Sequence, residues 1–314
     1  MQLHPGYLFI SRLLLFVFVL FFPPVPGRAD LPAQPGRARR VNTAMNTRAA
    51  YRLCAALLFL LPAFGCYPSY RPTTVPIGTI HYDAPGGPHQ ELLVYLPGYG
   101  DKPSAIEKHG LVRAARARGL TADIVAVDAH LGYYQEGTLF TRLQEDVVGP
   151  AKAGGYKNIW FVGNSLGAYG AILYAIRHPQ DITGAVLLGP FLGEKKTIDE
   201  IRQAGGLQQW DPGEVGEKTR EDWEKQIWLW LKLRQKQDDF RLWSKDCEQE
   251  KGCLPKIYLG YGKFDRFSRG QDLLASILPP EHVVALPGGH DWTTWRRAWD
   301  MILDRMAATK PGGR

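Results

Sequence analysis

The sequence predicts an α/β fold with a mostly parallel central sheet that is flanked by helices. Across residues 80–308, short apolar runs alternate with longer segments in which apolar residues recur at helical spacing. Such alternation is typical of parallel strands joined by right-handed helical crossovers. The chain has 314 residues, of which 45% are hydrophobic and 22% charged, so its length and composition suit one large globular domain or two small ones.

The predicted elements follow one another in chain order, with residues 67–79 as a Pro- and Tyr-rich tether before them and residues 309–314 as a tail after them. A charged stretch at residues 193–254, rich in tryptophan, interrupts the alternation. Strands are predicted at residues 80–83, 91–96, 122–127, 159–162, 185–188, 256–259 and 283–286, and helices at residues 104–118, 138–153, 171–176, 268–278 and 291–306.

Most of the net positive charge comes from the N-terminal part of the chain. Residues 1–66 contain seven Arg, no Lys and one Asp, and they therefore supply +6 of the net charge of +7. The rest of the chain is almost neutral, which argues against nucleic acid as its main partner. The eight histidines are scattered along the sequence, so we expect neither a metal site nor a cofactor.

Two apolar segments near the N-terminus have features of export signals. The first, residues 13–22, ends at two prolines and is short for a membrane span. In the second, residues 45–66, Met45 and two arginines precede an apolar run that ends shortly before Cys66. This segment resembles a bacterial lipoprotein signal, and the resemblance implies that Cys66 is lipidated and becomes the first mature residue. Residues 1–44 are then either an upstream extension before the true start or an N-terminal anchor.

Export would place the protein in the cell envelope, as a lipid-anchored periplasmic or outer-membrane protein. The two remaining cysteines fit an oxidising compartment, because Cys247 and Cys253 enclose a short polar loop and can reach disulfide distance. The alternative is a pair of free surface thiols. The oligomeric state cannot be predicted from the sequence.

The stretch from residue 159 to residue 176 organises the predicted site. A short apolar strand is followed by Gly-Asn-Ser-Leu-Gly at residues 163–167 and then by an apolar helix. Strand, G-x-S-x-G and helix in this order are the arrangement of a nucleophile elbow, in which Ser165 would adopt strained backbone geometry. Gly163 and Gly167 would avoid clashes where strand and helix nearly touch. The alternative is an ordinary Gly-rich turn.

With this elbow, residues 80–308 resemble the α/β-hydrolase superfamily, and its serine esterases and lipases in particular. That family places nucleophile, acid and histidine in this order along the chain. The resemblance implies that Ser165 is the nucleophile and that His290, in a Gly-Gly-His-Asp-Trp turn after the last strand, is its base. Asp265 follows the preceding strand, where the family carries the acid that orients the histidine.

Three other carboxylates are weaker alternatives for the acid. Asp128 ends an earlier strand, and Glu194 follows the strand after the elbow, where some lipase-like members carry their acid. Asp291 adjoins His290 in sequence and cannot easily face it.

The resemblance also implies an oxyanion hole made of two backbone N–H groups. The first belongs to Leu166, at the start of the helix after the elbow. The second belongs to Tyr99, because Pro-Gly-Tyr-Gly at residues 97–100 resembles the family's H-G-x-G loop, with Pro97 in the place of His.

The insertion at residues 193–254 falls where this family carries a lid, so we expect a helical lid. Trp223, Ile227, Trp230 and Leu231 share one helical face. That face could form an acyl pocket, or it could simply pack the insertion onto the domain. The expected partner is a small-molecule acyl ester of moderate apolar character.

Three functions are compatible with these features. The first is an exported serine hydrolase that cleaves carboxylic esters through an acyl-enzyme on Ser165. The second is an acyltransferase on the same fold, because an acyl-enzyme can pass its acyl group to an acceptor other than water. The third is a non-catalytic envelope protein on a hydrolase scaffold, against which the presence of Ser165, Asp265 and His290 argues.

Overall fold

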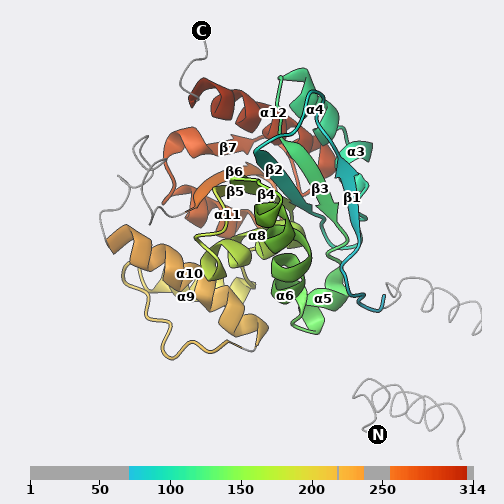
Figure 1. Cartoon of the computed structure of the whole chain (residues 1–314). Helices are drawn as coiled ribbons and strands as arrows, with labels where there is room; N and C mark the ends of the chain where they lie inside the picture. The colour runs from blue at the N-terminus through green and yellow to red at the C-terminus, as the bar shows by residue number, and fades with distance from the viewer. Residues whose placement is uncertain (1–70, 218, 237–254, 310–314) are drawn as a thin grey trace, which may run out of the picture. The chain divides into compact units, whose positions relative to one another are not determined.

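A seven-stranded sheet organises the residues that the computed structural model describes, which are 71–217, 219–236 and 255–309. The strand order is β1-β3-β2-β4-β5-β6-β7, with β1 antiparallel to β3 and all other neighbours parallel (Figure 1). The predicted α/β fold with a mostly parallel sheet is confirmed. The strands are β1 (Thr79–Tyr82), β2 (Glu91–Leu96), β3 (Asp123–Val127), β4 (Asn158–Asn164), β5 (Gly184–Leu188), β6 (Lys256–Gly262) and β7 (Val283–Leu286).

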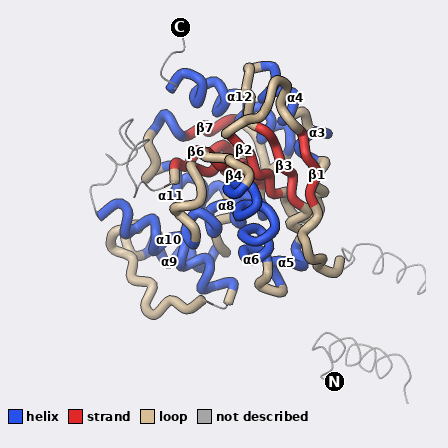
Figure 2. The backbone as a smooth tube through the Cα atoms, in the orientation of Figure 1, coloured by secondary structure: helices blue, strands red, loops and turns tan. Residues whose placement is uncertain are grey.

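Helices connect the strands and flank the sheet (Figure 2). None of the helices in the described residues combines the length and the apolar character needed to cross a bilayer. In chain order they are α3 (Ala105–Lys108), α4 (Leu111–Ala117), α5 (Leu131–Gln135), α6 (Leu139–Leu143), the π-helix η2 (Gln144–Val148), α7 (Gly149–Ala153), α8 (Leu166–Arg177), α9 (Lys195–Gln203), α10 (Arg220–Lys236), α11 (Ser268–Ala275), the 3-10 helix η5 (Pro280–His282) and α12 (Trp292–Thr309).

Alternate side chains of the strands β2 to β7 enter two separate hydrophobic clusters, one on each face of the sheet. In β2, Leu92 and Val94 belong to the cluster that α6, α8, α10 and α11 share, whereas Leu93 and Tyr95 belong to the cluster of α3, α4 and α12. This two-residue period is the geometric property of a strand that is covered on both faces.

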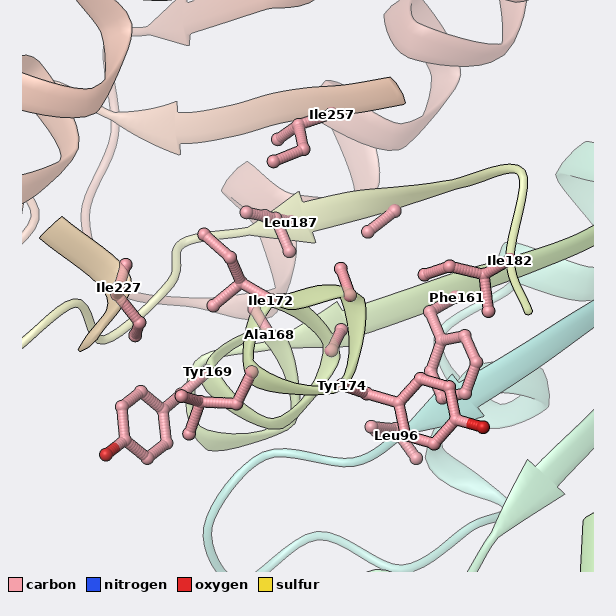
Figure 3. Packing of buried hydrophobic residues seen from close by; sticks show 14 of the residues in the cluster. Leu96, Phe161, Ala168, Tyr169, Ile172, Tyr174, Ile182, Leu187, Ile227 and Ile257 are labelled. Carbon is pink, nitrogen blue, oxygen red and sulfur yellow. The ribbon is translucent and has the colours of Figure 1, made fainter. Parts of the chain in front are cut away.

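Helix α8 is the most deeply buried helix of the first cluster. Every residue from Gly167 to Ala175 is buried, which is typical of a helix in a core rather than on a surface. Figure 3 shows its side chains among residues of the neighbouring strands, with Tyr174 beside Phe161 of β4 and Ile172 near Leu187 of β5. The rings of Tyr174 and Phe161 stack at 4.7 Å between centroids. The packing therefore fixes where the N-terminus of α8 lies.

Several predicted boundaries were wrong, for local reasons. The helix predicted at residues 104–118 is broken into α3 and α4 at Gly110, whose φ of 77° is incompatible with a continuing helix. The bounds of the helix predicted at residues 138–153 are confirmed within one residue, since α6, η2 and α7 follow one another from Leu139 to Ala153. The π-helical turn η2 precedes Pro150, which lacks the N–H that an unbroken α-helix would use. Helices α5 and α9 were not predicted.

The described part of the predicted tether, residues 71–79, is packed on the domain. Arg71 donates two hydrogen bonds of 3.0 Å to the carboxylate of Asp128. The backbone N–H of Ile77 donates to Asp146 at 2.8 Å, and the Ile77 side chain is only 3% exposed. The first strand then begins at Thr79, one residue earlier than predicted. The prediction of a tether is therefore wrong for residues 71–79, which pack on the domain and contribute Ile77 to its core.

We predict that Ile77→Ala lowers the free energy of unfolding by about 2–4 kcal/mol, because it leaves a cavity at a buried site. The matched control is Val75→Ala, because the Val75 side chain is 75% exposed, and this change should stay within about 0.5 kcal/mol. Urea denaturation of both variants measures the difference. Equal, small effects would mean that the segment is a tether after all.

Candidate active site

The junction between β4 and α8 holds Ser165 in an unusual backbone conformation. Its φ is 51° and its ψ is −112°. Among the described residues, Ser165 is the one non-glycine residue with a positive φ. Such geometry costs about 1–3 kcal/mol and is retained only where the surroundings enforce it. The strand, the strained serine and the helix together have the backbone geometry that the sequence predicts for an elbow at Ser165.

Two glycines allow this elbow to close. A Cβ at Gly163 would overlap the backbone of Gly167 at the start of α8, and a Cβ at Gly167 would overlap the carbonyl of Leu96 at the end of β2. Strand β4, helix α8 and the end of β2 thus approach one another more closely than side chains allow. The nucleophile loop lies directly beside the loop that follows β2.

Ser165, His290 and Asp265 form a continuous chain of hydrogen-bond distances. The Oγ of Ser165 lies 2.9 Å from Nε2 of His290, and Nδ1 of His290 lies 2.8 Å from Oδ2 of Asp265. The side chain of Asp265 is fully buried, and its Oδ1 accepts a hydrogen bond of 2.8 Å from the N–H of Phe267. These distances match a nucleophile, a base and a carboxylate that orients the base.

Three strand ends supply these residues. Ser165 follows β4, Asp265 follows β6 and His290 follows β7, and the carboxyl ends of parallel strands meet at one edge of the sheet. The loops after β6 and β7 are tied together, because the N–H of Phe264 donates to the carbonyl of Gly288 at 2.9 Å. Asp265 and His290 are therefore fixed relative to each other by the backbone.

The other three carboxylates have different partners. Asp128 pairs with Arg71 at 3.0 Å, and Glu194 pairs with Arg220 at 2.8 Å. Asp291 accepts the N–H of Thr294 at 2.9 Å in the first turn of α12, and this hydrogen bond lowers the pKa of Asp291. Of these acids, Asp265 is the one at hydrogen-bond distance from His290.

Aromatic rings cover the histidine. The ring of Phe267 lies 5.0 Å from that of His290 and the ring of Trp295 lies 4.9 Å from it, both nearly perpendicular to it. The His290 side chain is consequently only 9% exposed. This enclosure limits access of water to the imidazole, whose Nε2 lies at hydrogen-bond distance from Ser165.

The two predicted oxyanion donors lie on separate segments, at the start of α8 and in the loop after β2. Leu166 is the first residue of α8, so its N–H has no acceptor within the helix. Tyr99 lies in a turn that the N–H of Asp101 closes on the carbonyl of Gly98 at 3.1 Å, with Gly100 at a φ of 80°. The Tyr99 side chain is 54% exposed.

A buried polar residue beside the site that the sequence did not single out is Asn164, the last residue of β4. Its side chain is completely buried, and it forms hydrogen bonds with Tyr95 of β2 and with Gly98 and Asp101 in the loop after β2. The sequence does show a polar residue at the end of an apolar strand, but this pattern does not reveal which residues form hydrogen bonds with it.

Helix α10 packs its apolar face onto the domain. Ile227 and Leu231 are buried, and Trp223 contacts the ring of Phe140 edge-on at 5.8 Å. Trp228, which was not assigned to that face, is fully buried and donates to the carbonyl of Leu192 at 2.8 Å. Of the two interpretations of these aromatics, the structure favours packing of the insertion.

The remaining predicted sites lie outside the described residues. These are the lipidation site Cys66, the pair Cys247 and Cys253, and the export signal at residues 45–66. In the part of the chain that is described, no group of three or more His, Cys, Asp or Glu side chains could hold a metal ion.

A family model described as "Putative esterase" matches residues 149–306, which is half of the chain. The chain belongs to this esterase family. The matched region begins before β4 and ends within α12, so it contains Ser165, Asp265 and His290. Together with the sheet topology, this places the domain in the α/β-hydrolase superfamily, as the sequence predicted.

Solved structures similar to this esterase-family chain include two bacterial hydrolases. Fluorophosphonate-binding serine hydrolase F of Staphylococcus aureus is 14% identical, with a TM-score of 0.44, and the match covers 74% of this chain and 98% of that chain. An S-formylglutathione hydrolase from Agrobacterium tumefaciens is 14% identical, with a TM-score of 0.47, and the match covers 73% of this chain and 88% of that chain. Comparison with curated proteins gave no significant match.

We predict that Ser165→Gly is more stable than Ser165→Ala by about 1–2 kcal/mol, because glycine adopts a positive φ without strain. Both variants lack the hydroxyl, so the comparison isolates the backbone. The midpoints of urea denaturation measure the difference. An alanine variant as stable as the glycine variant would show that the elbow stores no strain.

Proposed function

We propose that this protein is a serine-dependent carboxylic ester hydrolase that works through an acyl-enzyme on Ser165. The observation that carries the proposal is the chain of short distances from Ser165 Oγ through His290 to the buried carboxylate of Asp265, at 2.9 and 2.8 Å. The position of Ser165 at a strained turn between strand and helix supports the same assignment, because this backbone geometry is typical of a nucleophile elbow.

In the acylation step, His290 Nε2 removes the proton of the Ser165 hydroxyl while Oγ attacks the ester carbonyl carbon. The carbonyl oxygen becomes an oxyanion, which the backbone N–H groups of Leu166 and Tyr99 stabilise. Asp265 holds the Nδ1 proton and stabilises the imidazolium. His290 then returns the proton to the leaving alkoxide, so that the alcohol departs and the acyl group remains on Oγ.

Deacylation repeats this sequence with water as the nucleophile. His290 takes a proton from the water as its oxygen attacks the acyl carbon, and the proton passes to Ser165 Oγ when the acyl-enzyme bond breaks. The products are a carboxylic acid, an alcohol and the free enzyme. We infer that the substrate is a small acyl ester of moderate apolar character, because the aromatic rings of Phe267 and Trp295 lie against the imidazole of His290.

The same proposal includes export and a lipid anchor. Residues 45–66 carry the pattern of a lipoprotein signal, with Cys66 as the acceptor of the lipid. A lipidated N-terminus would hold the enzyme at a membrane of the cell envelope.

We predict that the mature N-terminus is Cys66 and that it carries the lipid. Mass spectrometry of the protein isolated from its native host measures both. Retention of residues 1–44 in the mature protein would contradict the prediction.

We predict that Ser165→Ala abolishes hydrolysis of short-chain p-nitrophenyl esters and labelling by a fluorophosphonate probe, because the nucleophile is gone. His290→Ala should be about as damaging, since the three groups act as a unit. Asp265→Asn should lower kcat by roughly 10⁴-fold, because it favours the wrong imidazole tautomer. Steady-state kinetics on variants that retain their unfolding midpoint measures each loss.

The matched controls are Asp128→Asn and Glu194→Gln. Each removes a carboxylate charge from a residue that is paired with an arginine instead of with His290, so activity should persist. Full activity of Ser165→Ala would refute the proposed function. Full activity of Asp265→Asn with a loss in one of the controls would reassign the acid only.

A further inference from the structure

We propose that Asn164 is a positioning residue that fixes the oxyanion-hole loop relative to the nucleophile. The inference rests on the proposed esterase function, since it concerns the donor that Tyr99 supplies. Asn164 is the residue before Ser165, and its side chain is 0% exposed. A buried carboxamide at this point needs partners, because leaving one unpaired costs about 1–3 kcal/mol.

The carboxamide has three partners, all on β2 or on the loop that follows it. Its Oδ1 accepts a hydrogen bond of 2.8 Å from the hydroxyl of Tyr95 and one of 3.2 Å from the N–H of Gly98. Its Nδ2 donates to Oδ2 of Asp101 at 3.2 Å. One side chain thus connects the nucleophile strand to both the start and the end of the loop.

The chemistry of the partners allows only one orientation of the amide. The N–H of Gly98 can only donate and therefore requires the oxygen, whereas Oδ2 of Asp101 accepts and therefore requires the nitrogen. Burial and the nearby Asp101 raise the pKa of Tyr95, so its hydroxyl remains a donor. Asn164 therefore cannot flip without losing its contacts with Gly98 and Asp101.

Tyr99 lies between the two anchored points. The Asp101 N–H closes the turn on the Gly98 carbonyl at 3.1 Å, and Gly100 takes the positive φ that such a turn needs at its third residue. Holding Gly98 and Asp101 therefore holds the peptide N–H of Tyr99. Among the described residues, no acceptor contacts that N–H, which leaves it available to an oxyanion.

The loop after β2 also packs so closely on Asn164 that no side chain fits at Gly98. A Cβ at Gly98 would be 2.6 Å from Nδ2 of Asn164 and 3.3 Å from its carbonyl oxygen. The backbone of the loop consequently rests directly on the residue that precedes Ser165. A shift of about 1 Å in a catalytic donor can lower the rate by about 10²-fold. We therefore expect a displacement of this loop to lower kcat.

The test exchanges the two polar groups. Asn164→Asp keeps an acceptor for Tyr95 and Gly98 but brings a second carboxylate against Asp101, so the loop should move. We expect kcat to fall by about 10²-fold with KM within about threefold, because the oxyanion donor acts on the transition state. The double variant Asn164→Asp/Asp101→Asn restores a donor and an acceptor in reversed order, and kcat should recover at least about tenfold.

The control is Asp123→Asn, a change between the same residue types in a buried network at the opposite end of the sheet. Asp123 accepts from the N–H of Ala84 at 2.7 Å and from the hydroxyl of Tyr156 at 2.7 Å. This variant should lose stability without losing kcat. Urea denaturation of all variants separates the two effects.

Unchanged kcat in Asn164→Asp, or failure of the folded double variant to recover, would overturn the positioning role while leaving the esterase proposal intact. Should Asn164→Asp fail to fold, the double variant alone decides, because its kcat must then lie within about tenfold of wild type. A wild-type protein that neither hydrolyses esters nor reacts with the fluorophosphonate probe would overturn both proposals.

Discussion

The close approach of β4, α8 and the end of β2 at Ser165 is the constraint on which the rest of the site depends. The serine keeps a φ of 51° although such a conformation costs about 1–3 kcal/mol. The buried helix α8 supplies the compensation, because its side chains pack on several strands and fix its first turn. The absence of side chains at Gly163 and Gly167 then lets the three segments meet.

The parallel sheet turns residues that are distant in sequence into neighbours. His290 is 125 residues from Ser165 and 25 residues from Asp265, yet all three follow the carboxyl ends of strands that are adjacent or nearly so in the sheet. Backbone contacts between the loops after β6 and β7 fix the histidine and the acid relative to each other. The site therefore depends on strand order more than on any single loop.

Polar and aromatic groups have separate tasks around the site. The buried Asp265 has two hydrogen-bond partners, and the rings of Phe267 and Trp295 enclose the imidazole. Asn164 provides the polar connection between the nucleophile strand and the loop that carries Tyr99. In the proposed mechanism, different residues therefore orient the base and position the oxyanion donor.

The sequence by itself determined the strand and helix alternation, the elbow at Ser165 and the loops that carry Asp265 and His290, because each is a local pattern of apolar, glycine and polar residues. It did not reveal the break at Gly110 or the packing of residues 71–79, whose partners lie elsewhere in the chain. Only the tertiary structure decided the partners of Asn164, since Tyr95, Gly98 and Asp101 lie 69, 66 and 63 residues away in sequence. A hydrogen bond of that range depends on how β2 and β4 pair, and pairing is a property of the folded sheet.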